Sequence, residues 1–279
     1  MIHTSISAET LGRFTSAPSV SMHRSPEAPL AQRPFLVLVR SGPNPVPQPA
    51  WPAASAERQF DVLANFHAPP VQGCWLLDYA DYVATGGLSK FHAAKQLLTE
   101  EMLGRYAGVL FLDDDVETYF DPAAFAQFVT QQGFALSQAA LTPDSVAGHP
   151  VTLLHPSCAW RETNFVEVMA PFFTQALLKE AVGEFDRSIS GWGLDALWGA
   201  RYGASHSIAI VDVFTMAHRR PMDLKGGAFY RHLASLGLDP MREMADIFRE
   251  FGIERFEIVT RKVMFRPNGI QLAREAASP

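Results

Sequence analysis

Residues 109–117 read VLFLDDDVE, so four apolar residues lead directly into three adjacent carboxylates. The apolar part has the composition of a strand that is buried on both faces of a parallel sheet. The carboxylates then fall where this strand leaves the sheet, which is where open α/β sheets bind their ligands. Adjacent acidic side chains repel one another unless a cation joins them. The pattern therefore predicts a site for Mn²⁺ or Mg²⁺, because both ions accept oxygen ligands.

A structural interpretation of the acidic triplet stays open beside the functional one. Asp side chains are common in solvated turns and at the caps of helices. The strand that precedes the triplet favours the functional interpretation, because it carries the carboxylates to the edge of the sheet where ligands bind.

The rest of the chain alternates between strand-like and helix-like patterns. Apolar runs predict strands over 35–40, 60–66, 75–79, 82–84, 135–141 and 208–213. Amphipathic spacing and end signals predict helices from 89 to about 106 and over 123–132, 175–182, 195–203 and 228–251. Strands that alternate with helices in this way indicate an α/β sandwich with a mostly parallel sheet.

Length and composition suit one large domain with appendages. The chain has 279 residues, of which 48% are hydrophobic and 19% are charged, as in ordinary globular proteins. We expect a flexible N-terminal extension over 1–33, where Ser, Pro and Ala are frequent and apolar periodicity is missing. The main domain would then span 34–227. A C-terminal helical extension with a polar tail would span 228–279.

Charge and sequence signals exclude several classes of partner. The net charge is -6 and Lys and Arg form no stripe, so we expect no nucleic acid as partner. The two cysteines, Cys74 and Cys158, suit neither a disulfide framework nor a metal site. No apolar run has the length of a transmembrane segment, and the N-terminus lacks the apolar core of a secretory signal. We therefore expect a cytoplasmic protein, and a peripheral contact with the inner face of the membrane stays open.

Residues 190–195 read SGWGLD and form a second candidate element of a site. The glycines allow the backbone to approach a ligand, and Trp192 offers a flat apolar face on which a sugar ring can lie. Asp195 suits a general base that accepts the proton of a hydroxyl. The alternative is that Asp195 caps the following helix and that Trp192 belongs to the core.

A third candidate element follows the predicted strand over 208–213. His218 lies five residues beyond that strand and offers an imidazole as a ligand for Mn²⁺, although a lone His is more often a structural residue. Arg219 and Arg220, followed by a Gly-Gly pair, suit a diphosphate held near such a metal. A solvated surface loop is the alternative for this basic run.

In this order, the Asp-rich loop, the Gly-Trp-Gly-x-Asp turn and a His after a late strand resemble the core of the GT-A glycosyltransferases. More closely, residues from about 106 to 221 resemble the domain-of-unknown-function 707 family, which is glycosyltransferase-like. The matching segments are 111–115, 136–141, 166–171, 191–195 and 211–212 with His218. The resemblance implies a GT-A-like three-layer α/β/α sandwich with a mostly parallel central sheet. It also implies transfer of a sugar from a nucleotide-diphosphate donor to a hydroxyl of a glycan or glycolipid, as in polysaccharide biosynthesis.

The resemblance assigns roles by position. Asp113 and Asp115 match the DxD motif, and with His218 they would hold Mn²⁺ or Mg²⁺. The side chains that would contact the nucleotide sugar are Ser41, Lys90, Asp113, Asp114, Arg219 and Arg220. Asp195 would accept the proton of the acceptor hydroxyl, which gives inversion at the anomeric carbon; if it only orients the acceptor, retention stays open. The residues that would line the acceptor site are Trp192, Gly193 and Glu167, the last in a Val-Glu-Val strand pattern.

Two other functions stay compatible with the sequence. The acidic run is superficially similar to the nucleophile loop of the haloacid-dehalogenase family, which would make the protein a metal-dependent phosphohydrolase. That loop has Thr or Val two residues after its second Asp, where this chain has Glu117. The other function is non-catalytic binding of a sugar nucleotide or a carbohydrate, since a fold does not determine a function.

Overall fold

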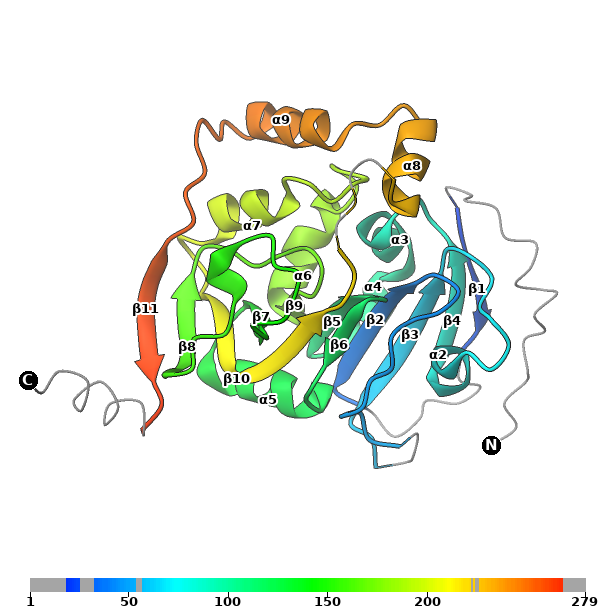
Figure 1. The fold of residues 1–279 in the computed structure, drawn as a ribbon, viewed down its shortest axis with the longest axis horizontal. Helices are drawn as coiled ribbons and strands as arrows, with labels where there is room; N and C mark the ends of the chain where they lie inside the picture. The colour runs from blue at the N-terminus through cyan, green and yellow to red at the C-terminus, as the bar shows by residue number, and fades with distance from the viewer. Residues whose placement is uncertain (1–18, 26–32, 54–56, 222, 224–225, 268–279) are drawn as a thin grey trace, which may run out of the picture.

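The computed structural model describes residues 19–25, 33–53, 57–221, 223 and 226–267, and Figure 1 shows their arrangement. Within these residues, one sheet of eleven strands runs across the molecule, with helices on both of its faces. The strands are β1 (Val20–Arg24), β2 (Phe35–Ser41), β3 (Phe60–Phe66), β4 (Tyr82–Gly86), β5 (Gly108–Asp113), β6 (Val116–Thr118), β7 (Leu136–Leu141), β8 (Cys158–Thr163), β9 (Phe172–Thr174), β10 (Ile208–His218) and β11 (Thr260–Phe265). The helices are α2 (Trp75–Tyr79), α3 (Lys90–Leu97), α4 (Glu100–Arg105), α5 (Pro122–Gln132), α6 (Gln175–Ala181), α7 (Leu194–Tyr202), α8 (Ala228–Ser235) and α9 (Pro240–Glu250).

The sheet has the strand order β1-β4-β3-β2-β5-β9-β7-β10-β8-β11, and β6 pairs with β10. β2 is parallel to both β3 and β5, β3 is parallel to β4, and β7 is parallel to β10. The short strand β9 is antiparallel to both β5 and β7, so β7 and β10 keep the direction of the other central strands. The predicted α/β fold with a mostly parallel central sheet is therefore confirmed. The parallel strands end at one edge of the sheet, and Asp113 lies there at the end of β5.

Two apolar layers join the helices to the two faces of the sheet. Val37 of β2 belongs to a core that includes Phe125 of α5. Its neighbour Leu38 belongs to the core on the other face, together with Phe91 of α3 and Trp198 of α7. Successive side chains of a strand point to opposite faces, so the continuous apolar run of β2 suits a strand that is covered on both sides.

The residues at the two ends of α5 begin and end the helix as the sequence predicted. The side chain of Asp121 accepts a hydrogen bond from the amide of Ala123 at 2.8 Å, and Pro122 occupies the first helical position. Gly133, with φ of 76°, ends the helix in a left-handed conformation that glycine adopts without steric cost. Over the described parts of the chain, none of the helices combines the length and the apolar composition that crossing a bilayer requires.

Residues 75–79 form helix α2, whereas the sequence analysis predicted a strand. Leu76 is buried, while Trp75 and Tyr79 lie one helical turn apart and both pack against Trp51. The prediction was wrong because a short apolar run does not distinguish a strand from a helix by periodicity.

Two further predicted elements differ from the structure. The helix expected from 89 to about 106 is divided into α3 and α4. The division falls at Thr99, whose side chain caps α4 by accepting from the amide of Met102 at 3.2 Å. The Val-Glu-Val pattern at 166–168 lies in a loop and not in a strand. This loop runs beside β5, where its backbone carbonyls satisfy amides of that strand.

Segments on both sides of the expected main domain contribute to the sheet. Within 1–33, β1 is antiparallel to β4 and Arg33 is buried, while residues 1–18 and 26–32 lie outside the described residues. Within 228–279, the helix expected over 228–251 is divided into α8 and α9, and β11 then adds to the sheet beside β8. These two strands differ from the flexible and helical extensions that we expected, because each finds a backbone partner at a sheet edge. The division of the chain into three parts stays a prediction.

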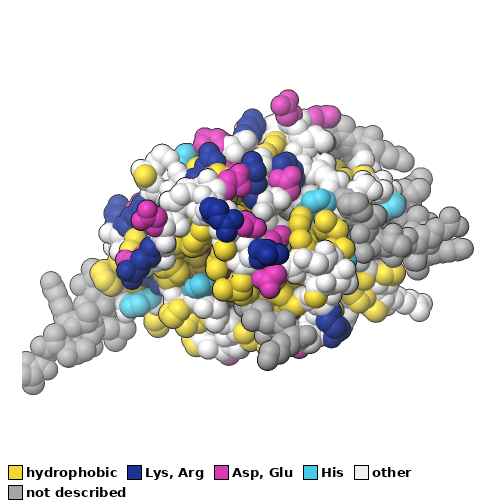
Figure 2. Space-filling view, turned by 90° about the horizontal axis from the view of Figure 1, so that it is seen from above, with side chains coloured by type: hydrophobic (Ala, Val, Ile, Leu, Met, Phe, Trp, Pro, Cys, Tyr) yellow, Lys and Arg dark blue, Asp and Glu magenta, His cyan; other side chains and the backbone are white. Residues whose placement is uncertain are grey.

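The face on the side of α8 and α9 carries charges of both signs. Figure 2 looks onto this face from above, and Lys and Arg side chains lie there among Asp and Glu side chains. Because charges of opposite sign are interspersed on this face, they favour local ion pairs over an electrostatic potential of a single sign.

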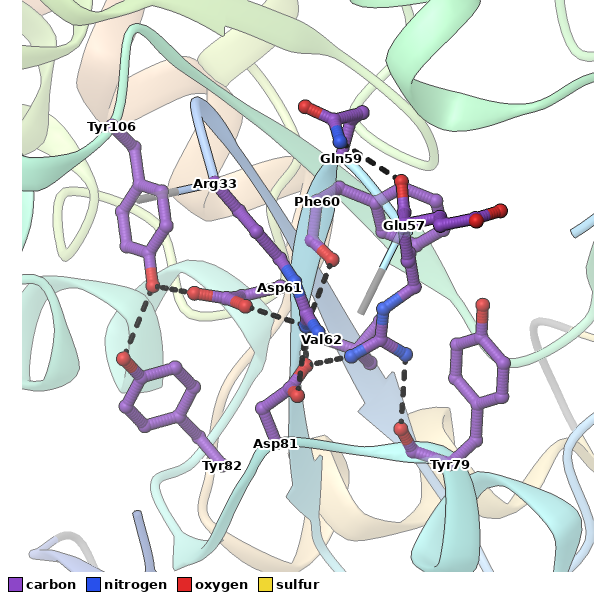
Figure 3. A network of polar contacts seen from close by, with 11 residues as sticks. Arg33, Glu57, Gln59, Phe60, Asp61, Val62, Tyr79, Asp81, Tyr82 and Tyr106 are labelled. Atoms are coloured by element: carbon purple, nitrogen blue, oxygen red, sulfur yellow. Dashed lines mark hydrogen bonds and ion pairs between the residues drawn. The ribbon is translucent and has the colours of Figure 1, made fainter. Parts of the chain in front are cut away.

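A buried network of ion pairs lies where β2, β3 and β4 begin (Figure 3). Nη1 of Arg33 lies 2.9 Å from Oδ1 of Asp61 and 3.0 Å from Oδ1 of Asp81, and Arg58 also pairs with Asp81. The hydroxyl of Tyr106 donates to Asp61 at 2.7 Å. Buried charges are tolerated when they are paired and hydrogen-bonded, so this network ties the starts of the central strands together.

Candidate active site

Asp113 ends β5 and pairs with a lysine from the start of α3. Nζ of Lys90 lies 2.8 Å from Oδ1 of Asp113 and donates to the backbone carbonyl of Met169, also at 2.8 Å. The side chain of Lys90 is 6% exposed and that of Asp113 is 40% exposed, so the cation is enclosed while the carboxylate reaches solvent. Burial lowers the pKa of Lys90, and the charge of Asp113 opposes this shift. The structure therefore brings these two predicted donor-site residues into contact.

Asp114, the middle residue of the acidic triplet, turns toward the loop after β2. Its Oδ2 accepts from the amide of Gly42 at 2.7 Å, and its Oδ1 lies 3.1 Å from Nη1 of Arg220. Nη2 of Arg220 donates to the backbone carbonyl of Asn44 at 2.7 Å. Burial raises the pKa of Asp114 to about 6, although the Gly42 hydrogen bond and the Arg220 charge oppose this shift. Asp114 thus joins Arg220 to the loop that directly follows Ser41, one of the predicted donor residues.

Asp115 faces the predicted histidine. Its Oδ2 lies 3.3 Å from Nε2 of His218, and Nδ1 of the same ring lies 2.8 Å from the carbonyl oxygen of Val146. Burial lowers the pKa of His218, but the hydrogen bond and the charge of Asp115 outweigh it and raise the pKa to about 9. β10 continues beyond the predicted strand and pairs with β6, which sets His218 opposite Val116. This pairing explains why two residues far apart in sequence meet at the end of β5.

Asp113, Asp115 and His218 suit Mn²⁺ or Mg²⁺ in donor chemistry, since they offer two carboxylates and an imidazole. Lys90 and the His218 ring now supply the positive charge that the two carboxylates need. Across the described residues, no group of three or more His, Cys, Asp and Glu side chains is arranged to hold a metal ion. The three residues thus fit a metal by the type of their donor atoms and not by their present arrangement, in which Nε2 of His218 is paired with Asp115.

Asp195 lies in the first turn of α7, directly after the SGWGLD loop. Its Oδ1 accepts from the amide of Ala196 at 2.8 Å, which is a contact typical of a carboxylate at the start of a helix. Burial raises the pKa of Asp195 to about 6, against the effect of its backbone hydrogen bonds. Gly193, and not Asp195, is the N-cap of α7, so Asp195 complements the start of the helix without capping it. Its pKa also suits proton transfer near neutral pH.

Trp192 and Gly193 both contact the C-terminal helices. Trp192 is half-buried, and its Nε1 donates to the hydroxyl of Tyr230 on α8 at 3.4 Å. Gly193 has φ of 86°, and a Cβ at this position would lie 3.1 Å from Cα of Met244 on α9. Glycine is therefore required by the backbone conformation and by the close approach of α9, whereas we had expected a ligand to require it.

Glu167 is 5% exposed and lies in the loop that precedes β9. Neither of its carboxylate oxygens has a hydrogen-bond partner among the residues that the structure describes. Burial, and after it the charge of Asp195, raises the pKa of Glu167 to about 7. The charge of His218 and the nearby amides of Gly148 and His149 oppose this shift. Burial favours the protonated form of a carboxyl group, so Glu167 keeps its proton to a higher pH than an ordinary glutamate does.

The predicted metal and acceptor residues lie in one neighbourhood. His218 contacts Asp115 and is also affected by the charge of Asp113. Glu167 is affected by the charges of both His218 and Asp195. The segment 146–148 adjoins both His218 and Glu167: the carbonyl oxygen of Val146 lies 2.8 Å from Nδ1 of His218, and a Cβ on Gly148 would lie 3.1 Å from Oε1 of Glu167.

Two predicted donor residues have their polar atoms engaged elsewhere. The hydroxyl of Ser41 is buried and donates to the carbonyl of Gly42 at 2.8 Å. Arg219 forms ion pairs of 2.7 Å with Glu117 and 2.8 Å with Asp144. Of the two adjacent arginine side chains, that of Arg220 is thus the one that reaches the acidic triplet, whereas Arg219 meets Asp115 through its backbone amide.

Arg40 belongs to this edge of the sheet and was missed by the sequence analysis. It lies opposite Asn65 of β3 and Asp113 of β5, and it is 9% exposed. Its guanidinium donates to the side chain of Asn65 and to the carbonyls of Gly86 and Gly87 at 2.6 Å each. The sequence signal that could have identified it is a charged residue at the end of a fully apolar strand. A cation buried there needs several hydrogen-bond partners, which mark a polar site.

Comparison with known proteins shows similarity in three-dimensional structure and not in sequence. No protein-family model matches the chain, and no curated protein matches it in sequence. GalNAc-T7 in complex with UDP, GalNAc and Mn²⁺ has a TM-score of 0.51 and 9% identity, over 78% of this chain and 48% of that one. A fragment of S. aureus TarS in complex with UDP-GlcNAc has a TM-score of 0.41 and 13% identity, over 80% and 74% of the two chains. A197 from STIV has a TM-score of 0.37 and 11% identity, over 67% and 86%.

Identities this low concern the fold alone, and of these three structures GalNAc-T7 has a TM-score high enough to support a shared fold. The match covers 48% of the GalNAc-T7 chain, which is about half of its length. The predicted GT-A-like α/β architecture is confirmed by the sheet topology and by this similarity. The narrower resemblance to the domain-of-unknown-function 707 family stays a prediction.

Proposed function

We propose that this protein is a metal-dependent glycosyltransferase that uses a nucleotide-diphosphate sugar as donor. The proposal rests on one observation: the acidic triplet at the end of β5 meets the side chains of Lys90, His218 and Arg220. Cations and carboxylates together suit a diphosphate and its metal ion. Asp195, with a pKa of about 6, suits proton transfer.

The donor would lie against the carboxyl ends of β2 and β5. The amide of Gly42 and the cations of Lys90 and Arg220 meet there around the acidic triplet. Backbone amides and cations together are a common way to bind a diphosphate. UDP is the first nucleotide to test, because GalNAc-T7, which shares the fold, is in complex with it.

Asp113, Asp115 and His218 would hold Mn²⁺ or Mg²⁺. The ion would supply positive charge that stabilises the departing diphosphate. Lys90 would share this role, because its ammonium already lies at the first of these carboxylates.

The acceptor would be a hydroxyl of a glycan or glycolipid that lies on Trp192. As its oxygen bonds to the anomeric carbon, the bond from that carbon to the diphosphate breaks and the hydroxyl proton passes to Asp195. A pKa of about 6 leaves Asp195 ionised at neutral pH, so it can accept the proton. Attack from the face opposite the leaving group inverts the anomeric centre. The stereochemistry of the product distinguishes this route from a retaining one in which Asp195 only orients the acceptor.

A thermal-shift screen of nucleoside diphosphates, each with and without Mn²⁺, tests the donor site. A ligand that binds the folded state raises the midpoint by mass action. We expect a shift with UDP that depends on Mn²⁺ and is lost in Asp115→Ala. Release of UDP from UDP-GalNAc and UDP-GlcNAc then tests turnover.

The two alternative functions give different results in the same experiments. A non-catalytic binding protein would show the nucleotide shift without release of UDP. A phosphohydrolase would release inorganic phosphate from a phosphomonoester and would leave the sugar–phosphate bond intact. Absence of a shift with every nucleotide would remove the donor site from this edge of the sheet.

A further inference from the structure

Helix α9 lies along the top of the molecule above α7 (Figure 1) and contacts the loop that leads into α7. A Cβ on Gly193 would lie 3.1 Å from Cα of Met244 and 3.3 Å from Cδ1 of Ile247, so the helix touches the loop backbone. The sequence analysis treated this helix as part of an extension, yet it packs directly on the acceptor side of the site.

Glu243 of α9 accepts two backbone hydrogen bonds from this loop. Its Oε1 accepts from the amide of Ile189 at 2.8 Å, and its Oε2 accepts from the amide of Ser190 at 2.9 Å. Oγ of Ser188 lies 3.4 Å from the same Oε2. Hydrogen bonds to a carboxylate are stronger than those between neutral groups. Both oxygens of Glu243 are therefore used to hold one short segment of backbone.

Ser190 connects this segment to the tryptophan. Its Oγ accepts from the amide of Trp192 at 3.2 Å, and the indole of Trp192 in turn donates to Tyr230 of α8 at 3.4 Å. The loop is thus held by α9 at its start and by α8 at its aromatic side chain.

The loop needs such contacts because its own backbone does not define its conformation. Gly191 and Gly193 flank Trp192 and have φ of 84° and 86°. Glycine loses more conformational freedom on ordering than any other residue. Contacts from outside the loop must therefore offset this cost before Asp195, two residues further on, can take a defined place.

We propose that Glu243 is a positioning residue of the candidate site: it holds the loop backbone and thereby sets the place of Trp192 and Asp195. This inference rests on the proposed glycosyltransferase function. Glu243 touches none of the reacting groups and would act only through the loop.

The test compares Glu243→Gln with Glu250→Gln in the full chain. Gln keeps one acceptor oxygen and replaces the other with an NH₂ group that cannot accept, so one loop amide loses its partner. Glu250 lies on the same helix in an exposed ion pair with Arg187, at 2.9 Å, and is a matched control. In Glu243→Gln we expect kcat for release of UDP from UDP-GalNAc or UDP-GlcNAc to fall roughly 10- to 100-fold. KM for the donor and the Mn²⁺-dependent thermal shift with UDP should stay unchanged.

Hydrogen exchange of the backbone amides provides a readout that does not depend on activity. We expect residues 188–195 to exchange faster in Glu243→Gln, while the core strands exchange as in the wild type. Glu243→Asp keeps both oxygens, so it should recover part of kcat, and it replaces the Gln variant if that one does not fold. Unchanged exchange and unchanged kcat in Glu243→Gln would overturn the inference. A wild type that releases no UDP would instead reject the proposed function, and the exchange rates would still decide whether Glu243 holds the loop.

Discussion

The ammonium of Lys90 lies 2.8 Å from the carboxylate of Asp113, at the point where β5 leaves the sheet. The carbonyl of Met169 accepts a second hydrogen bond from the same ammonium, so the cation is enclosed by the loop that also carries Glu167. An enclosed cation beside a solvent-exposed carboxylate is suited to meet an incoming diphosphate.

Lys90→Met should weaken both the fold and donor binding. It leaves the Met169 carbonyl and the Asp113 carboxylate without this partner, so we expect the free energy of unfolding to fall by about 1–3 kcal/mol in urea denaturation. UDP affinity in Mn²⁺ should fall roughly tenfold. Lys95→Met is the control, because Lys95 pairs with Asp186 on the surface and should change stability by less than about 1 kcal/mol. Equal UDP affinities in wild type and Lys90→Met would remove Lys90 from the donor site.

The two adjacent arginines after β10 should differ in effect. Arg220 contacts Asp114 and the carbonyl of Asn44, whereas Arg219 is engaged by Glu117 and Asp144. We expect Arg220→Ala to weaken UDP binding roughly tenfold by calorimetry and Arg219→Ala to leave it within about twofold. If Arg219→Ala shows the larger loss, the basic run binds the diphosphate in an arrangement other than the one described.

The pH dependence of sugar transfer should show the pKa of the proposed base, Asp195. With a pKa of about 6, Asp195 is protonated below this pH and ionised above it. Only the ionised form accepts a proton, so kcat should rise with pH through about 6 and then level off. Asp195→Asn should lower kcat by roughly 10²- to 10⁴-fold while UDP binding is retained. A pH profile for the wild type that is flat between pH 5 and 7 would exclude Asp195 as the base.

Glu167→Gln should stabilise the fold at alkaline pH. The pKa of Glu167 is about 7 in the folded state against an ordinary value of 4.5, so the folded state keeps its proton over this interval while the unfolded state releases it. Stability therefore falls as pH rises from 4.5 to about 7, by about 3 kcal/mol in total. Glutamine removes this dependence, and the variant should exceed the wild type in urea denaturation at pH 8 but not at pH 4.5. A variant that is stabilised yet less active would mark Glu167 as a site residue.

The buried ion-pair network at the start of the strands should respond strongly to the loss of one partner. Asp81→Ala leaves Arg33 and Arg58 without a shared carboxylate, so we expect a loss of about 3–5 kcal/mol in unfolding free energy. Asp246→Ala, in an exposed pair with Arg249, should cost less than about 0.5 kcal/mol. Similar losses in the two variants would mean that water reaches the network and screens its charges.

Local sequence patterns were sufficient to predict most strands of the central sheet and the edge of the sheet that carries the candidate site. The apolar run before Asp113 is β5, and the carboxylates follow it directly, because both properties belong to one continuous segment. Residues 75–79 were wrongly predicted as a strand because the information lies outside the segment. The helix there depends on packing against Trp51, which the sequence of 75–79 does not show.

The sequence by itself determined which residues are candidates: an acidic triplet after a buried strand, an Asp after a Gly-Trp-Gly turn, and a His with two arginines after a late strand. Only the tertiary structure decided their division of roles. Asp113 meets Lys90 and Asp115 meets His218, and the side chain of Arg220 rather than that of Arg219 reaches the triplet. Each of these partners comes from a different element, and pairing between strands distant in the chain sets their separation. Sequence patterns report burial and periodicity within a segment, but hydrogen bonds and charges act between whichever segments the fold brings together.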